Sequence, residues 1–265
     1  MCELLGISAD HLVSFSCSLD RFASHGSAKG ENHDGWGIAA YEEHDARIIK
    51  APGSAAESEW VRFVETHGFT SPLVIAHIRH ASAGPPSYSN THPFYRELGG
   101  RMHVFAHNGT LPGVTSLALE AHGYQPIGQT DSEHAFCMLL DRLAGLWQGD
   151  RQPSIAERHA VVARFAAEMS SLGPANFLYS DGDLLFAHGH RRPQADGRIE
   201  PPGLHFIERK DIPPAEVSWL ASGARISHGP EPVAIVASVP LTDEPWQPLR
   251  EGELLVLSRG RLLDY

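Results

Sequence analysis

Cys2 is the residue whose position could give it the most distinctive chemistry. If the initiator methionine is removed, Cys2 carries both a thiol and a free α-amine. The amine has a pKa of about 7.7–8.0 and the thiol one of about 8.5, so the amine can accept the thiol proton near neutral pH. One residue would then supply both nucleophile and base, as in enzymes with an N-terminal threonine. The alternative is that Cys2 is a small structural residue on an edge strand, the usual role of a lone cysteine.

Three short segments further along the chain could complete a site around that nucleophile. Arg79 follows an apolar strand pattern and offers a planar guanidinium that suits a carboxylate, although it could also form a surface ion pair. Asn108 and Gly109 could donate their side-chain and backbone N–H groups to one oxyanion, although Asn-Gly is also a common turn. Asp131 could accept a hydrogen bond from an ammonium group, or simply stabilise a helix N-terminus.

The histidines and cysteines do not indicate a metal or a disulfide framework. Three cysteines are an odd number without a CxxC pair, and Cys137 lies in an apolar helical pattern that predicts a core position. Five histidines fall on the strands and loops of the candidate site, without HExxH or His/Cys ligand spacing: His77, His80, His92, His103 and His107. We therefore expect hydrogen-bonded structural histidines, no metal and no cofactor.

Composition places the chain among ordinary soluble proteins and excludes several partners. It has 265 residues, of which 42% are hydrophobic and 20% charged. Its net charge of −11 argues against a nucleic-acid partner. No apolar run approaches the ~20 residues of a membrane span, and the first residues lack the basic and long apolar regions of a signal peptide, so we expect neither membrane association nor export. The expected location is the cytoplasm.

Hydrophobic periodicity predicts an α+β protein in which strands lie on both sides of a helical middle. Without a repeat or linker, residues 1–265 are predicted to form one domain. Residues 81–95, rich in Pro and Gly, are expected to form a loop. The predicted helices are 11–23, 57–66, one that follows a capping box at residues 130–133, and 154–172. The predicted strands are 2–8, 35–41, 47–51, 73–80, 102–107, 176–179, 184–188, 204–207, 217–221, 233–238 and 254–263, the last broken by Gly260.

The order of these segments resembles that of the class II glutamine amidotransferases, the glutaminases with an N-terminal nucleophile. Each motif taken singly is short, but a cysteine at position 2 followed by five ordered motifs is specific. The matching segments span residues 1 to about 147 and read Met1-Cys2-Glu3-Leu4-Leu5-Gly6, Asp34-Gly35-Trp36-Gly37-Ile38-Ala39, Ala76-His77-Ile78-Arg79-His80-Ala81-Ser82, Asn90-Thr91-His92-Pro93-Phe94, Ala106-His107-Asn108-Gly109 and Gln129-Thr130-Asp131-Ser132-Glu133.

The resemblance implies a four-layer αββα sandwich of the N-terminal-nucleophile hydrolase type, and a role for each matching residue. Cys2 would be the nucleophile, and its α-amine the base. Asn108 and Gly109 would form the oxyanion hole. Arg79 would bind the α-carboxylate of glutamine and Asp131 its α-ammonium group. Ser82 stands where the family has a threonine, so it would retain a hydroxyl contact with the substrate.

The resemblance also implies an enzyme with no synthase domain of its own, similar to small stand-alone bacterial amidotransferases. An ammonia-accepting synthase, if there is one, would be another chain. Two other functions remain open. The same nucleophile could hydrolyse a γ-glutamyl amide or peptide, with Arg79 and Asp131 still binding the unchanged γ-glutamyl end. Alternatively, the chain could be a non-catalytic module that binds glutamine or scaffolds a synthase.

Overall fold

The computed structural model contains two β-sheets that pack face to face. It describes residues 2–17, 34–55, 58–80, 84–120, 123–149, 151–194, 196–210, 218–219, 224–227 and 232–265. No helix among these residues is long and apolar enough to span a membrane.

The first sheet has nine strands, and its main path runs β15-β11-β14-β1-β4-β2-β3. The remaining two strands extend it beside the second half of β1, where β13 pairs with β1 and β12 pairs with β13. The strands are β1 (Glu3–Cys17), β2 (Trp36–Glu42), β3 (Asp45–Ala51), β4 (Phe69–Ile78), β11 (His205–Arg209), β12 (Ser218–Trp219), β13 (Ala224–Ser227), β14 (Val233–Ala237) and β15 (Gln247–Pro248).

The second sheet has six strands in the order β17-β16-β8-β7-β6-β5, and a separate two-stranded hairpin joins β9 to β10. These strands are β5 (Phe94–Leu98), β6 (Arg101–Gly109), β7 (Ala175–Ser180), β8 (Leu185–Gly189), β9 (Arg192–Pro193), β10 (Ile199–Glu200), β16 (Glu253–Ser258) and β17 (Arg261–Leu263). The helices are α2 (Glu59–His67), α3 (Asp131–Ala144) and α4 (Ile155–Leu172), with short 3₁₀ turns η1 (Tyr88–Asn90) and η2 (Val114–Ser116).

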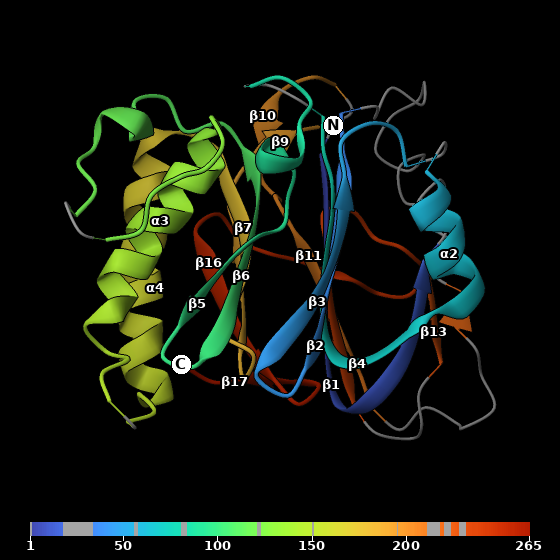
Figure 1. Cartoon of the computed structure of the whole chain (residues 1–265). Helices are drawn as coiled ribbons and strands as arrows, with labels where there is room; N and C mark the ends of the chain where they lie inside the picture. Colours follow the sequence, from blue (N-terminus) through green and yellow to red (C-terminus); the bar gives the residue numbers. More distant parts are fainter. Residues whose placement is uncertain are drawn as a thin grey trace.

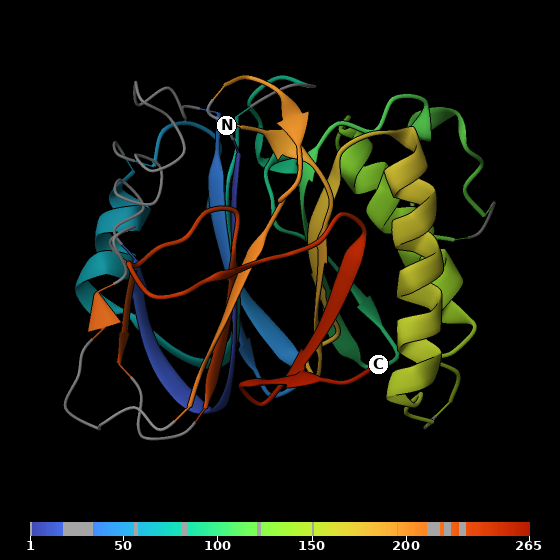
Figure 2. The ribbon, with the colours of Figure 1, turned by 180° about the vertical axis from the view of Figure 1, so that it is seen from behind.

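The layers follow the αββα order that the resemblance predicts. Helices α3 and α4 cover the outer face of the six-stranded sheet, and α2 lies on the outer side of the nine-stranded sheet (Figures 1 and 2). Buried apolar side chains form three clusters that correspond to the three interfaces between layers. The middle cluster joins the facing sheets through residues such as Leu4 and Leu178. Strand alternation explains this arrangement, because successive side chains on one strand enter different clusters.

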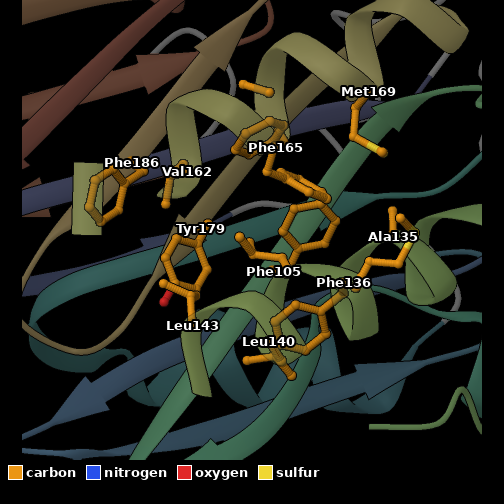
Figure 3. Packing of buried hydrophobic residues seen from close by; sticks show 14 of the residues in the cluster. Phe105, Ala135, Phe136, Leu140, Leu143, Val162, Phe165, Met169, Tyr179 and Phe186 are labelled. Atoms are coloured by element: carbon orange, nitrogen blue, oxygen red, sulfur yellow. The ribbon is translucent and has the colours of Figure 1, made fainter. Parts of the chain in front are cut away.

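Aromatic packing dominates the interface between the six-stranded sheet and its two helices (Figure 3). Phe105 of β6 stacks on Phe136 of α3, with ring centroids 5.4 Å apart and an interplanar angle of 5°. Phe165 of α4 meets the same Phe105 ring edge-on at 6.3 Å. Each such fully buried side chain stabilises the fold by about 1.5–3 kcal/mol relative to an exposed one. This interface holds α3 against the end of β6, where Asn108 and Gly109 lie.

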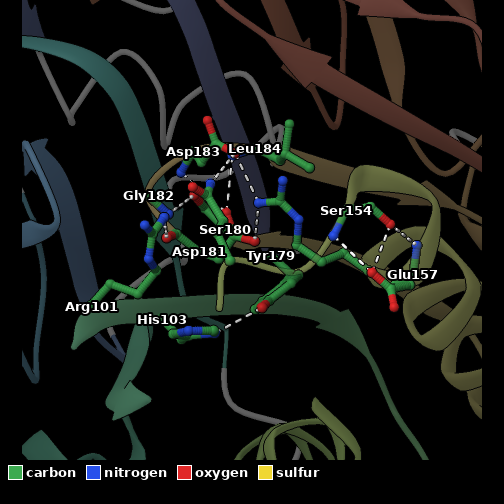
Figure 4. Close-up of polar contacts among 12 residues, drawn as sticks. Arg101, His103, Ser154, Glu157, Tyr179, Ser180, Asp181, Gly182, Asp183 and Leu184 are labelled. Carbon is green, nitrogen blue, oxygen red and sulfur yellow. Dashed lines mark hydrogen bonds and ion pairs between the residues drawn. The ribbon is translucent and has the colours of Figure 1, made fainter. Parts of the chain in front are cut away.

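A buried ion pair holds the β7–β8 turn against α4 (Figure 4). Arg158 Nη1 lies 3.0 Å from Asp181 Oδ2 and 2.9 Å from Asp183 Oδ2. The other oxygen of Asp181 accepts the backbone N–H groups of Asp183 and Leu184. The turn is therefore satisfied by its own aspartate, and the guanidinium balances the buried charge.

Three predictions of secondary structure need correction. Residues 11–17 were predicted as helix, but they continue β1 as far as Cys17 past an irregularity between Ser8 and Val13; residues 18–23 lie outside the described part. Pairing with β4 and β13 supplies the backbone hydrogen bonds that decide for strand over the apolar spacing. The last two residues of the predicted loop at 81–95 belong to β5, which begins at Phe94. This strand forms a hairpin with β6 across Gly99 and Gly100, both in left-handed conformations.

The predicted capping box of α3 is half formed. Thr130 accepts the N–H of Glu133, as predicted, but the Glu133 carboxylate accepts the N–H of Gly128 and pairs with Arg96. A complete capping box occurs instead at the start of α4, between Ser154 and Glu157. Glu133 therefore joins α3 to β5 rather than closing only its own helix.

Candidate active site

Cys2 lies at the start of β1, beside the end of β4. Glu3 pairs with Ile78, so the antiparallel register carries Cys2 to the residues that follow β4. The thiol Sγ accepts the N–H of His80 at 3.0 Å and lies 3.1 Å from the His80 carbonyl oxygen, to which it donates. Burial raises the pKa of the Cys2 thiol, while the His80 N–H and the charge of Arg79 act in the opposite direction. A thiol in this environment needs a base to become a nucleophile.

The end of β6 brings Asn108 and Gly109 to the same place. Asn108 Nδ2 donates to the backbone carbonyl oxygen of Cys2 at 2.6 Å, although the two residues are 106 positions apart. Asn108 and Gly109 line one cavity of about 190 Å³ together with Cys2. The other described residues lining it are His80, Thr110, Pro174, Asn176, Arg191, Arg192, Pro193 and Ile199.

Gly109 occupies a position that no other residue type could fill without rearrangement. Its φ is 152°, and a Cβ built on it would lie 1.8 Å from the carbonyl oxygen of Pro174. The chain at Pro174 therefore passes directly against this glycine, which leaves the Gly109 backbone at the cavity wall. A requirement for close backbone approach is the physical reason for a glycine here.

Asn176 holds the backbone of Asn108 in place, a role that no motif in the sequence indicates. It faces Asn108 across the β6–β7 pair and is 1% exposed. Its Nδ2 donates to the carbonyl oxygens of Asn108 at 3.0 Å and Arg191 at 2.7 Å, and its Oδ1 accepts the N–H of His190 at 2.7 Å. A polar residue opening an otherwise apolar strand was the only signal in the sequence.

Arg79 is buried just after β4, and its guanidinium donates to backbone carbonyl oxygens of two other segments. Its Nη1 donates to the carbonyl oxygen of Asp34 at 3.2 Å, and its Nη2 donates to that of Gly84 at 3.0 Å. Its backbone N–H donates to the Gly35 carbonyl at 2.8 Å. The guanidinium thus lies close enough for its charge to act on the Cys2 thiol, between the strand that begins near Gly35 and the segment that begins at Gly84. It is not among the described residues that line the Cys2 cavity.

Asp131 opens α3 and spans the gap between the helix and the end of β6. Its Oδ2 accepts the N–H of Leu111 at 2.8 Å, and its Oδ1 accepts the N–H of Ser132 at 2.8 Å. The Ser132 hydroxyl lies 2.9 Å from Nδ1 of His107, which immediately precedes Asn108. Asp131 and Asn108 are thus connected through a short buried chain, although Asp131 is also absent from the described lining of the cavity.

Two residues named from the sequence cannot be placed. Ser82 and Met1 lie outside the described residues, so neither the expected hydroxyl contact nor the state of the N-terminus is described. The position of Cys2, immediately after Met1, is nevertheless defined.

The histidines near the site lie in different environments. His77 and His92 lie with ring centroids 4.2 Å apart, both fully buried, and burial lowers the pKa of His77 to about 3. His103 contacts the Tyr179 hydroxyl at 2.8 Å, away from the cavity. Within the described residues no group of three or more potential ligands has the geometry to hold a metal ion.

A buried ion pair joins β1, just after Cys2, to the β9–β10 hairpin that lines the cavity. Arg192 Nη2 lies 3.0 Å from Oε1 of Glu3, and both side chains are at least nine-tenths buried. The neighbouring Nη1 of Arg192 donates to the Ser238 carbonyl, and Ser238 Oγ accepts the N–H of Leu4. The β9–β10 hairpin is therefore anchored directly beside Cys2.

Comparison with known proteins gives a consistent result. A family model described as glutamine amidotransferases class-II matches residues 1–265. YafJ of Escherichia coli K12, which carries a glutamine amidotransferase name, is 35% identical over 262 residues that cover 98% of each chain. A predicted glutamine amidotransferase from Pseudomonas aeruginosa PA01, known from its crystal structure, has a TM-score of 0.71 and 32% identity, covering 99% of this chain and 100% of that one. The glutamine PRPP amidotransferase of Bacillus subtilis shares the fold, with a TM-score of 0.58 at 16% identity; the match covers 98% of this chain and 48% of that one.

Proposed function

Since the chain belongs to the class II glutamine amidotransferases, we propose that it hydrolyses the side-chain amide of glutamine through a thioester on Cys2. The observation that carries this proposal is the meeting of Cys2 with Asn108 and Gly109 in one cavity. A nucleophile and two potential oxyanion donors from distant parts of the chain thus face the same small volume. The active species in this proposal lacks Met1.

The first step needs a base, and the mature N-terminus would supply it. Burial raises the pKa of the Cys2 thiol, so little thiolate forms without help. After removal of Met1, the α-amine of Cys2 would accept the thiol proton, directly or through a water molecule. With Met1 retained, that nitrogen would be an amide without basicity, and the free amine would be displaced by one residue, about 3.8 Å.

Thiolate attack on the substrate amide carbon forms the carbon–sulfur bond and places a negative charge on the amide oxygen. Asn108 Nδ2 donates one N–H to the Cys2 carbonyl, which leaves its second N–H for this oxyanion. The Gly109 N–H would be the second donor. Loss of one such donor typically lowers the rate by about 10²–10³. The oxyanion then collapses, the carbon–nitrogen bond breaks, and the protonated α-amine gives its proton to the departing ammonia.

Hydrolysis completes the cycle. Water attacks the thioester, glutamate leaves, and the Cys2 thiol is regenerated. The released ammonia could diffuse away or pass to a synthase on another chain. The reaction needs no cofactor in this scheme, because every proton transfer is served by the terminal amine or water.

The amino-acid end of glutamine would be bound by opposite charges. Arg79 would bind the α-carboxylate, Asp131 the α-ammonium group, and Ser82 would contribute its hydroxyl. Arg79 donates to the carbonyls of Asp34 and Gly84, and Asp131 accepts the N–H of Leu111. The amino-acid end of glutamine would therefore have to be bound beside these contacts or in their place.

A second candidate function is favoured by the shape of the cavity. It extends from Cys2 along Pro174 to Pro193 and the half-exposed Ile199, so the wall beyond the nucleophile is largely apolar. Ammonia does not need such a wall, whereas the leaving amine of a γ-glutamyl amide or peptide could pack against it. The γ-glutamyl end would still use Arg79 and Asp131.

One assay separates these functions. Purified protein, with Met1 status checked by intact mass, is incubated with glutamine and with γ-glutamyl-leucine, and glutamate and ammonia are both quantified. Release of both from glutamine, abolished by Cys2→Ala, supports the glutaminase. Preferential turnover of the peptide, also lost in Cys2→Ala, supports the second candidate. If Met1-free protein binds glutamine but turns over neither glutamine nor γ-glutamyl-leucine, both functions are refuted and a non-catalytic module remains.

A further inference from the structure

Lys50 is a buried cation that the proposed reaction does not use. It lies on β3, an edge strand of the nine-stranded sheet, and is 9% exposed. Its Nζ donates to the carbonyl oxygens of Thr91 at 2.7 Å and Pro93 at 3.3 Å. An ammonium group has three donors, and among the described residues no acceptor contacts the third.

A second cavity opens in front of this ammonium group. It has a volume of about 360 Å³ and lies between β3 and β5, the neighbouring edge strands of the two sheets. Three aromatic rings surround Nζ: Tyr88, Phe94 and Tyr95 have their centroids at 4.8, 5.5 and 5.4 Å. The exposed side chain of Ile127 forms part of the rim. The walls are therefore mainly apolar, and a charge lies at the base.

The carboxylates of this cavity are already engaged elsewhere. Glu133 pairs with Arg96 at 2.7 Å and accepts the N–H of Gly128 at 2.6 Å. Glu97, which is exposed, accepts the N–H of Gly100 at 2.7 Å. Among the described residues no carboxylate lies within 4 Å of Lys50 Nζ, although the charge of Glu133 still reaches it.

Burial without a paired carboxylate disfavours the charged form of Lys50, and its pKa is correspondingly lowered. Burial lowers its pKa to about 8, Glu133 opposes the change and Arg96 adds to it. The other titratable groups facing Nζ are the phenols of Tyr88 and Tyr95 and the buried imidazole of His92, whose own pKa is lowered by burial. None of these groups supplies a negative charge at neutral pH, so an external anion would relieve the cost.

We propose that this cavity binds a small apolar monoanion, a carboxylate on an aromatic or aliphatic body. The carboxylate accepts the free N–H of Lys50, and the apolar body packs between Tyr88, Phe94 and Ile127. The site is separate from the Cys2 cavity, with which it shares no lining residue among those described. It does not depend on the proposed hydrolysis, and it is tested by binding alone.

The probe is benzoate, and benzamide is its neutral counterpart of nearly the same shape. Isothermal titration calorimetry of the full chain is expected to show benzoate binding at least tenfold more tightly than benzamide. Lys50→Met, which keeps an unbranched side chain only one atom shorter and removes its charge, is expected to abolish that ratio. Lys210→Met is the matched control, because Lys210 is an exposed lysine paired with Glu208, and it should keep the wild-type ratio. Equal binding of the two probes, or a ratio that persists in Lys50→Met, overturns the proposal.

A measurement on the wild type keeps the test decisive if Lys50→Met does not fold. A lysine with a pKa of about 8 is half protonated at pH 8, and an anion beside it holds the proton. Benzoate binding should therefore take up about half a proton at pH 8 and almost none at pH 6.5. Proton uptake follows from the calorimetric enthalpy in buffers of different ionisation enthalpy. Binding without this pH-dependent uptake, or no binding, refutes the site.

Discussion

Gly109→Ala offers the sharpest test of how the proposed oxyanion hole is built. The added Cβ would lie 1.8 Å from the carbonyl oxygen of Pro174, and contacts below 3.0 Å are essentially never seen. The backbone must therefore move by at least about 1.2 Å, the difference of these two distances. Because both partners are main chain at a strand end, no side-chain rotation can relieve the overlap.

Two costs are expected from this change. Strain at a φ of 152° and overpacking against Pro174 should together lower the free energy of unfolding by about 3–5 kcal/mol. Displacement of the Gly109 N–H should lower the single-turnover rate of glutamate release by about 10²–10³. Urea unfolding at a temperature where the variant is folded gives the first quantity, and single-turnover glutamate release gives the second.

Gly100→Ala is the matched control. Gly100 has a φ of 78° in the β5–β6 turn, but a Cβ there would meet nothing within 4 Å. Conformational strain alone should cost about 1–2 kcal/mol and leave activity unchanged. If Gly109→Ala matched Gly100→Ala in stability and retained wild-type turnover, the close approach at Pro174 would not shape the site, and the reasoning would be wrong.

Three further variants test the surroundings of the site. Glu3→Gln should destabilise the protein by about 3 kcal/mol in urea unfolding, because it leaves the Arg192 guanidinium buried without its counter-ion; Arg192→Met in the same chain should recover part of this loss. Asn176→Ala should lower kcat about tenfold, since it releases the backbone of Asn108 to which Asn176 donates; unchanged kcat would contradict its positioning role. His103 has a pKa lowered by burial from 6.5 to about 4, so its neutral form favours the fold above pH 6.5 and this contribution is lost as pH falls to 4. The pH dependence of unfolding in His103→Gln should therefore be shallower by about 3 kcal/mol over that range.

Local patterns predicted the helices and most strands because their signals are contained within a few residues. The Thr130 cap, the apolar spacing after it and the β2–β3 hairpin all appear where the sequence indicates. The helix prediction at residues 11–17 was wrong because apolar side chains at helical spacing also occur in strands. Pairing with the distant strands β4 and β13 decides that this segment is a strand. The start of β5 was hidden for the same reason, since its partner strand β6 defines it.

The candidate site could be predicted from the sequence only in part. Cys2, Asn108 and Gly109 meet at one cavity, whereas Arg79 and Asp131 are not among its described lining residues and Ser82 lies outside the described part of the chain. Asn176 could not be inferred from spacing, because its role depends on the β6–β7 register that sets it opposite Asn108. The Glu3–Arg192 pair joins residues 189 positions apart, and no local pattern predicts which buried charges meet.

The site is consequently a product of strand register more than of any loop. Cys2 immediately precedes β1, Asn108 and Gly109 end β6, and both places are set by antiparallel ladders of the two sheets. A slip of one residue in the β6–β7 ladder would turn Asn108 from the inter-sheet side to the helical side and bring His107 to face Cys2. Such a slip is opposed by the whole core, because Phe105 would leave its stack on Phe136. The packing far below the cavity therefore holds the amide of Asn108 against the Cys2 carbonyl, so large-to-small changes at Phe105 should affect turnover as well as stability.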